Sequence, residues 1–313
     1  MAFGNSSFDT ILSTTLKNYR EQLVDNIFTS RPLFFYLDRD GMVEQGGEKI
    51  VVPVLGGKNT TAGSYSGADT ISITAQTGIT AAEYSWKQFA ASVFITGLEE
   101  AQNYGEHAII DLLQSKVMQA EESIKEALDE DLVAGDGTGN SSKDFNGLVN
   151  LIGTTNTVGG IDGNDSDNTW WRSYVEGSAG SLTLADMATA QNTVSFGNDK
   201  PKLILTTQTL YEAYEALLQP QQIFQSSQAA DAGFDTLMHK GVPVHYDAYT
   251  PSGVMYFVNT SYIKLVKHTA KWFEPTPFVK PTNQDVRVAQ ILCYGNLVVM
   301  SRRHQGKLTG RTA

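Results

Sequence analysis

The sequence predicts an α+β protein in which an extended flap, a long helix and a compact α/β unit follow one another. Residues 49–96 favour strands around a polar, glycine-rich tip. Residues 98–133 favour a helix, with no proline and only Gly105 as a glycine. Residues 181–260 alternate helix-like and strand-like segments, which indicates an α/β unit. A flap that leads straight into a long helix is an unusual order for an enzyme core. It fits a subunit that reaches over its neighbours.

Length and composition indicate a globular protein with a core of its own. The 313 residues can form one large domain or two ordinary ones. No apolar run approaches the ~20 residues that a membrane span needs, and the first ten residues lack the regions of a secretory signal. Cys293 is the sole cysteine, which excludes an internal disulfide framework and a cysteine-based zinc site. A protein folded in a reducing cytosol, with no membrane contact, fits these features best.

Charge is spread unevenly along the chain. Residues 1–260 hold 14 Lys and Arg against 32 Asp and Glu, a balance of −18, whereas residues 261–313 hold 9 against 2, a balance of +7. The acidic bulk argues against a protein that coats nucleic acid. The basic end could touch phosphate, or it could meet an acidic surface of the same protein. Self-association is the more economical interpretation, because each copy then supplies both signs.

The N-terminal region predicts an amphipathic helix over residues 8–28, because apolar side chains recur there every three or four positions. Pro32 ends this pattern and the apolar run 33–37 follows. We expect the helix either to dock on a partner or a distant part of its domain, or to cover its own core.

The flap predicts a long two-stranded hairpin. Residues 49–55 form its first strand, in which Pro53 indicates an edge or a bulge. The tip, residues 56–70, is rich in glycine and polar side chains and can hardly build a core. The return strand changes phase, which predicts a bulge near 87–88. An isolated hairpin is marginal in water, so this one needs a surface to lie on.

The acidic helix is expected to span roughly 50 Å and to end at the glycines of residues 135–139. A short apolar segment (144–152) and a polar loop (153–180) come next. The elements expected further on are a helix (182–194), a strand (202–206) and a helix that Thr207 caps and that runs to Leu218. Strands are expected over 241–247, 254–259, 263–268, 286–294 and 297–301, the last two joined by a turn at 295–296.

The sequence contains few signs of a catalytic or metal-binding site. Phosphate-binding, nucleophile-elbow and metalloprotease motifs are absent from the sequence. The best metal candidate is the run 162–168, but it lacks the glycine and glutamate of a calcium loop, and a solvated loop is favoured. His245 and Asp247 alternate onto one strand face and could form a base, yet no nucleophile accompanies them, so a structural histidine is favoured. The sequence therefore predicts no catalytic residues, no cofactor, no metal site and no enzyme activity.

The ordered segments resemble, over nearly the whole chain, the major capsid proteins of tailed bacteriophages with the HK97-like fold. The stretches that carry the resemblance are SRPLFFYL (30–37), DFNGLVNLIG (144–153), KLILTTQTLYEAYEALL (202–218), HKGVPVHYD (239–247), MYFVN with IKLVKH (255–268) and VVMSRRHQGKLTG (298–310). The resemblance implies an N-terminal arm (1–46), an extended β-hairpin E-loop (47–96), a peripheral domain with a spine helix (97–180), an α/β axial domain (181–260) and a β return to the peripheral domain (261–313).

The resemblance also implies a function. Such subunits form hexamers and pentamers of an icosahedral shell that encloses double-stranded DNA without sequence-specific binding. The shell is part of the virion and assembles in the bacterial host cytoplasm. Because Met1 leads directly into the arm, a scaffolding protein would be a separate partner, beside a portal and a decoration protein. The nearest alternative is an encapsulin-type nanocompartment with an enzyme cargo; a tail protein and a hydrolase rank below it.

The site residues expected from this resemblance are contacts between subunits. They lie at the flap tip and near the C-terminus: Lys58, Asn59, Tyr65, Arg302, Arg303 and Lys307. We expect Arg302, Arg303 and Lys307 to meet the acidic helix of the same or an adjacent subunit, the alternative being solvated surface side chains. Some family members join subunits covalently through a flap lysine. Lys58 is a candidate donor, although a solvated lysine is favoured.

Overall fold

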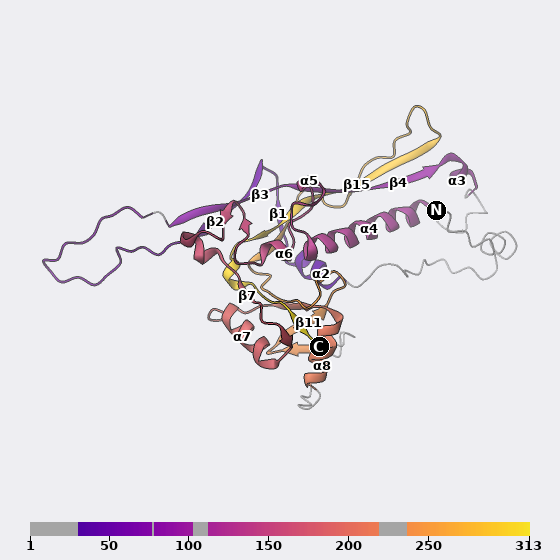
Figure 1. Ribbon diagram of the computed structural model, residues 1–313. Coiled ribbons are helices and arrows are strands. Elements are labelled where there is room, and N and C mark those ends of the chain that lie inside the picture. Colours follow the sequence, from indigo (N-terminus) through magenta and orange to yellow (C-terminus); the bar gives the residue numbers. More distant parts are fainter. Residues whose placement is uncertain (1–30, 77, 103–111, 219–236) are drawn as a thin grey trace. The chain divides into compact units, whose positions relative to one another are not determined.

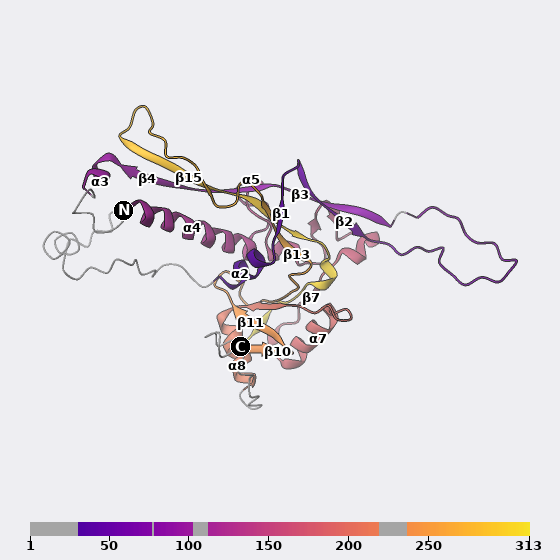
Figure 2. The same ribbon diagram turned by 180° about the vertical axis from the view of Figure 1, so that it is seen from behind.

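The computed structural model describes residues 31–76, 78–102, 112–218 and 237–313 (Figures 1 and 2). These residues divide into two compact units, the smaller of which contains the described parts of 90–125 and residues 273–292. The helix predicted over residues 8–28 lies outside the described part of the chain. No described helix combines the length and the apolar character that crossing a membrane requires.

The larger unit contains a six-stranded sheet covered by two helices. The strands, in spatial order, are β10 (Leu237–His239), β11 (Val242–Tyr246), β9 (Leu203–Thr206), β12 (Met255–Val258), β16 (Gly306–Leu308) and β7 (Tyr174–Glu176). The helices α7 (Leu184–Val194) and α8 (Gln208–Leu218) pack their apolar sides on this sheet. Every residue of β9 and β12 is buried, as their continuous apolar sequences require of central strands. The helices and strands predicted over 182–259 are confirmed, with ends that differ by up to two residues.

Both helices begin at a threonine. Thr183 accepts a hydrogen bond from the backbone N of Asp186 at 3.2 Å, which satisfies a free amide of the first turn of α7. Thr207 accepts from the backbone N of Leu210 at 3.4 Å, so its predicted capping of α8 is confirmed. The carboxylate of Asp186 also pairs with Arg311 at 3.0 Å, which ties α7 to the end of the chain.

A second sheet of the larger unit consists of β1 (Met42–Glu44), β13 (Ile263–His268) and the C-terminal half of β15 (Val286–Val299). The turn predicted at Gly295–Asn296 was wrong, because β15 runs through it. A side chain at Gly295 would place Cβ 2.4 Å from the carbonyl of Val266 on β13, so glycine permits the close approach of the strands. The buried Asn296 accepts from the backbone N of Asn146 and donates to the carbonyl of Ser85.

Helix α2 (Pro32–Arg39) forms from the apolar run that follows the predicted N-terminal helix. Pro32 occupies its first turn, where the missing N–H costs nothing. Salt bridges and hydrogen bonds then fix α2 to the second sheet. Lys267 pairs with Asp38 at 2.6 Å, and Thr260 donates to Asp40 at 2.8 Å.

The acidic helix is α4 (Leu112–Ala134), whose 23 residues span about 35 Å. A shorter helix, α3 (Gly97–Gln102), precedes it. Residues 103–111, on which the predicted single helix depends, lie outside the described residues. The predicted end is confirmed: Gly135 donates to the carbonyl of Asp131 at 2.8 Å, where a Cβ would be only 2.4 Å from that oxygen.

The segment from 153 to 180, predicted as a polar loop, is more ordered than expected. It contains β5 (Thr157–Val158), β6 (Ile161–Asp162), the 3-10 helix η3 (Ser166–Trp171), β7 and β8 (Gly180–Ser181), the last paired with β17 (Arg311–Thr312). Short helices α5 (Gly139–Ser142) and α6 (Leu148–Leu151) precede it. Trp171 is buried and its indole N–H donates to the carbonyl of Val158 at 3.1 Å.

The smaller unit is built from β4 (Lys87–Thr96), β14 (Glu274–Pro275), the first half of β15, α3 and the first half of α4. Both β4 and β14 pair with β15, and Glu274 lies opposite Leu292. Gly97 donates to the carbonyl of Asp285 at 3.0 Å, and Arg287 pairs with Glu100 at 3.3 Å. These contacts join α3 to the loop before β15 and to the start of β15.

Candidate functional site

The flap contains a two-stranded antiparallel ribbon of β2 (Lys49–Leu55) and β3 (Ile79–Ser85), labelled in Figure 1. Lys49 lies opposite Ser85 and Leu55 opposite Ile79. The predicted change of phase in the return strand occurs at Trp86, one residue earlier than expected. After Trp86 the chain leaves the ribbon, because β4 pairs with β15 instead.

One face of the ribbon is apolar and uncovered. Alternate residues of a strand point to opposite faces, and Val52 and Val54 are buried while Val51 and Leu55 are 54% and 75% exposed. The residues of this outer ribbon face are Val51, Pro53, Leu55, Ile79 and Ala81. A salt bridge between Lys49 and Glu83 borders the face. Contiguous exposed apolar residues of this kind mark protein interaction sites.

The loop 56–78 between the two strands makes its described hydrogen bonds locally. Asn59 accepts from the backbone N of Thr61 at 2.8 Å, and Thr60 donates to Gln76 at 3.1 Å. The predicted contact residues Lys58, Asn59 and Tyr65 are all exposed. So are two isoleucines of the same loop, Ile71 and Ile73. Their contact with another subunit stays a prediction.

Glycines and a tryptophan form the base of this loop. Gly56 and Gly57 both donate to the carbonyl of Gly78, at 2.8 and 3.3 Å. A Cβ on Gly56 would lie 2.3 Å from the indole of Trp170, so only glycine permits this contact. A cavity of about 530 Å³ lies here, lined by the glycines, Trp170 and polar residues of the 162–168 loop.

The acidic loop 162–168, the predicted metal candidate, uses its carboxylates for its own backbone. Asp162 accepts from the N of Asn164 at 2.8 Å, and Asp165 accepts from the N of Asp167 at 3.0 Å. Within the described ranges, His, Cys, Asp and Glu side chains form no group of three or more that could hold a metal ion.

Arg302 is fully buried and acts inside the subunit. Its guanidinium donates to four backbone carbonyls at 2.8–3.0 Å, those of Leu151, Gly153, Asn156 and Trp171. Burial lowers its pKa to about 10. The prediction that Arg302 meets the acidic helix of the same or an adjacent subunit was wrong, because the guanidinium is buried against these four carbonyls. Sequence reasoning missed this role, since nothing in the sequence distinguishes Arg302 from the exposed Arg303.

The other two basic residues lie near the surface. Arg303 is exposed and its guanidinium lies 3.8 Å from the ring centre of Phe196. Lys307 is half-buried, and burial lowers its pKa. Among the described residues neither forms an ion pair with α4, so their contact with an adjacent copy stays a prediction. The opposite charges of the two sequence regions do meet within the chain, as Lys267–Asp38, Arg287–Glu100 and Arg311–Asp186.

His245 and Asp247, the candidate general base and the carboxylate that would orient it, contact two different helices. The imidazole of His245 lies 3.4 Å from the hydroxyl of Tyr36 on α2, and burial lowers its pKa. Asp247 is buried against Asp129 of α4, and burial raises its pKa. The two side chains therefore serve different tertiary contacts.

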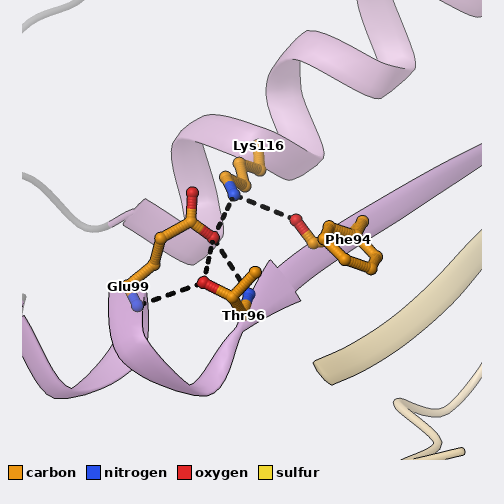
Figure 3. A network of polar contacts seen from close by, with 4 residues as sticks. All are labelled: Phe94, Thr96, Glu99 and Lys116. Carbon is orange, nitrogen blue, oxygen red and sulfur yellow. Dashed lines mark hydrogen bonds and ion pairs between the residues drawn. The ribbon is translucent and has the colours of Figure 1, made fainter. Parts of the chain in front are cut away.

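A polar network fixes the start of α3 in the smaller unit (Figure 3). Thr96 accepts from the backbone N of Glu99, and Glu99 accepts from the backbone N of Thr96, which is a reciprocal capping box. Lys116 of α4 donates to the same carboxylate at 3.0 Å and to the carbonyl of Phe94 at 2.9 Å. The backbone amide of Thr96 and then Lys116 hold the pKa of Glu99 below its usual range.

A groove of about 450 Å³ lies beside this network, between β4 and α4. It is lined by Ala91, Ser92, Val93, Phe94, Lys116, Gln119, Ala120 and Ser123. Four of these eight lining residues are apolar, and Phe94 among them is 47% exposed, so the smaller unit offers a recess with an exposed apolar side chain.

A family model of known proteins matches most of the chain. Residues 68–312 match the model described as SU10 major capsid protein. The chain belongs to this family. It is therefore a capsid shell protein, and copies of the capsid subunit build the shell. Phage capsid proteins are components of the virion. A comparison with curated protein sequences found no match.

Solved structures show the same α+β, HK97-like capsid fold. The capsid protein of cyanophage A-1(L) is similar at a TM-score of 0.71 and 16% identity, covering 94% of this chain and 96% of its own. The encapsulin SrpI of Synechococcus elongatus PCC 7942 is similar at a TM-score of 0.65 and 13% identity, covering 100% and 97%. The capsid of an empty GTA particle is similar at a TM-score of 0.64 and 13% identity, covering 93% and 100%.

Proposed function

We propose that the capsid subunit forms hexamers and pentamers of an icosahedral shell around double-stranded DNA, held together partly by its outer ribbon face. The observation that carries the contact is the uncovered row of apolar residues on β2 and β3, among which Leu55 and Ile79 are 75% and 80% exposed. Burying them would stabilise the contact by about 25 cal/mol for each Å² of apolar surface. A neighbouring copy is the partner that a shell supplies at every site.

The groove between β4 and α4 of a neighbouring copy is suited to receive this face. Phe94 supplies apolar surface there, since it is 47% exposed in the single chain, whereas Val93 and Ala120 are buried. Lys58, Asn59 and Tyr65 extend the contact along the loop. Arg303 and Lys307 add charged contacts at the edge of a second copy, where exposed ion pairs contribute little energy but help to fix orientation.

The remaining parts of the proposal concern partners and place. The net charge of −11 suits a container that does not bind its DNA tightly or by sequence. A separate scaffolding protein, a portal and a decoration protein would complete the particle. Assembly would take place in the cytoplasm of the bacterial host, and the subunit would carry out no catalysis.

The test compares assembly of the wild-type chain with that of a Leu55→Asp/Ile79→Asp variant by sedimentation and negative-stain electron microscopy. We expect closed shells or rings from wild type and free subunits from the variant, with the same unfolding transition in both. The matched control is Glu83→Gln on the same strand, which should assemble normally. Shells of equal yield from the aspartate variant would reject the ribbon contact, and wild-type chains that stay monomeric with their phage partners present would reject the shell.

The second candidate is an encapsulin-type shell with a protein cargo. It is favoured by the similarity to SrpI over the full length of the chain. The contents of particles isolated from the producing cell distinguish the two. Nuclease-protected double-stranded DNA supports the phage shell, whereas a single co-purified enzyme supports the nanocompartment.

A further inference from the structure

Two buried carboxyl groups, those of Asp129 and Asp247, interact where α2, α4 and the loop after β11 meet. Asp129 on α4 is fully buried and Asp247 is 3% exposed. One oxygen of each is satisfied by backbone: Asp129 accepts from the N of Phe34 at 3.1 Å, and Asp247 accepts from the N of Tyr249 at 2.9 Å. The second oxygen of each, Oδ2, is buried without a hydrogen-bond donor among the described residues.

A proton between the two unsatisfied oxygens would account for both. Two ionised carboxylates in contact and away from water repel, whereas one proton turns the same contact into a charge-assisted O–H···O⁻ hydrogen bond. Burial and the adjacent carboxyl of Asp247 raise the pKa of Asp129 to about 8, and burial raises the pKa of Asp247. Both shifts favour the protonated form, so the pair binds a proton more tightly than an exposed aspartate does.

The surrounding charges are mostly negative. Glu126 and Glu130 on α4 face the loop, and the hydroxyl of Tyr249 donates to Glu126 at 2.5 Å. Arg31, just before α2, opposes them by favouring ionised Asp129. On β9, the group that meets Asp247 is an uncharged carbonyl, that of Thr206, which accepts from the N of Asp247.

The Asp129 carboxylate also serves α2. The side chain of Arg31, at the N-cap position, does not cap this helix. The backbone N–H of Phe34 in the first turn instead donates to Asp129 of α4. The carboxyl pair thus joins α2, α4 and the loop after β11. The hydrogen bond between Tyr249 and Glu126 joins the same loop to α4 one helical turn away.

We propose that the Asp129–Asp247 pair is a proton-dependent latch that holds the loop 247–250 and the first turn of α2 to helix α4. When the latch opens, the O–H bond between the carboxyls breaks, the proton passes to water or hydroxide, and two carboxylates remain. Their repulsion drives the loop away from α4 and admits water. The latch acts within one chain, so it does not depend on the proposed shell.

The first experiment measures thermal unfolding of the full chain at fixed ionic strength from about pH 5 to about pH 9, for wild type and Asp247→Asn. An amide at 247 keeps the acceptor for Tyr249 and donates permanently to Asp129. Because the folded pKa is raised, folded wild type binds the extra proton and loses stability as pH rises from the usual aspartate range to about 8. We expect the unfolding temperature of Asp247→Asn to rise relative to that of wild type by several degrees across this window, and to stay higher at pH values above it.

The matched control is Asp131→Asn on the same helix, whose carboxylate accepts from the N of Phe145 and whose pKa burial raises to about 6. The difference in unfolding temperature between Asp131→Asn and wild type should stop growing near pH 6, not near pH 8. If Asp247→Asn differs from wild type by a constant amount at every pH, the latch is rejected.

A second measurement on wild type alone keeps the proposal testable if the variant does not fold. Hydrogen exchange, corrected for the intrinsic pH dependence, should show loss of protection at Phe34 and Tyr249 as pH rises past about 8, while Met255 in the central strand β12 stays protected. Unchanged protection at both sites overturns the latch. So would stabilisation of the pair by added Ca²⁺ or Mg²⁺, since that result would assign the two oxygens to a cation.

Discussion

The six-stranded sheet and the flap ribbon are both β structure, but they differ in what completes them. The central strands β9 and β12 have neighbours on both edges and side chains buried on both faces. The ribbon has two strands, one buried face and one exposed apolar face. The sheet is therefore complete within one chain, whereas the outer ribbon face stays uncovered there. Changes in the sheet should alter unfolding, and changes on the outer ribbon face should alter assembly.

The largest expected effect is in the sheet. Phe257→Ala empties a fully buried position of β12, which should lower the free energy of unfolding by about 3–5 kcal/mol. Denaturant unfolding with the tyrosine and tryptophan signal measures this. If Val51→Ala, on the outer ribbon face, lowers the free energy of unfolding by as much, the contrast between sheet and ribbon is wrong.

Next comes Arg302→Met, which keeps the length of the side chain and removes its donors. Four buried carbonyls then lose their partner, and we expect a loss of about 3 kcal/mol in unfolding free energy. The control is Arg303→Gln, where an exposed cation over Phe196 is lost, at a cost of about 0.5 kcal/mol. Equal losses in the two variants would contradict the internal role of Arg302.

A smaller effect is expected at the capping box of the smaller unit. Glu99→Ala removes the acceptor for the N of Thr96 and should cost about 1 kcal/mol. Because the folded pKa of Glu99 is lowered, its contribution is present above the usual glutamate pKa and is lost as pH falls below it. Unfolding at neutral and at acid pH checks this: the difference between wild type and variant should shrink in acid.

The smallest effect on unfolding is expected on the outer ribbon face. Val51→Asp should change the unfolding free energy by less than about 0.5 kcal/mol, although it should impair assembly. Its neighbour Val52 points to the buried face, so Val52→Asp should destabilise the subunit by roughly 3 kcal/mol. A calorimetric comparison of the pair tests whether one step along the strand separates folding from assembly.

Regular, strongly periodic elements were predictable from the sequence. The helices α7 and α8 and the strands β9, β11 and β12 follow from their apolar patterns, α8 also from its cap at Thr207, and α4 ends at the predicted glycines. The register change in the flap was predicted to within one residue, because alternation fixes which face a side chain occupies.

Features set by distant contacts were not predictable. Gly295 and Asn296 have the composition of a turn, yet the close approach of Val266 and the buried amide contacts make them strand. The loop 153–180 is ordered by Arg302, more than a hundred residues later. The Asp129–Asp247 pair depends on tertiary packing in the same way, since no local pattern indicates which carboxyl groups will meet out of water.

The position of Arg302 along the chain also bears on the order in which a newly made subunit folds. The carbonyls that it holds belong to residues 151–171, and β16, which sits between β12 and β7, comes later still. At ribosomal speed, on the order of ten seconds separates the synthesis of Trp171 from that of Arg302. During that interval these four carbonyls lack the Arg302 guanidinium and the sheet lacks an inner strand. Completion of this part of the subunit is thereby postponed until Arg302 and β16 have been synthesised, which delays shell contacts from half-made chains.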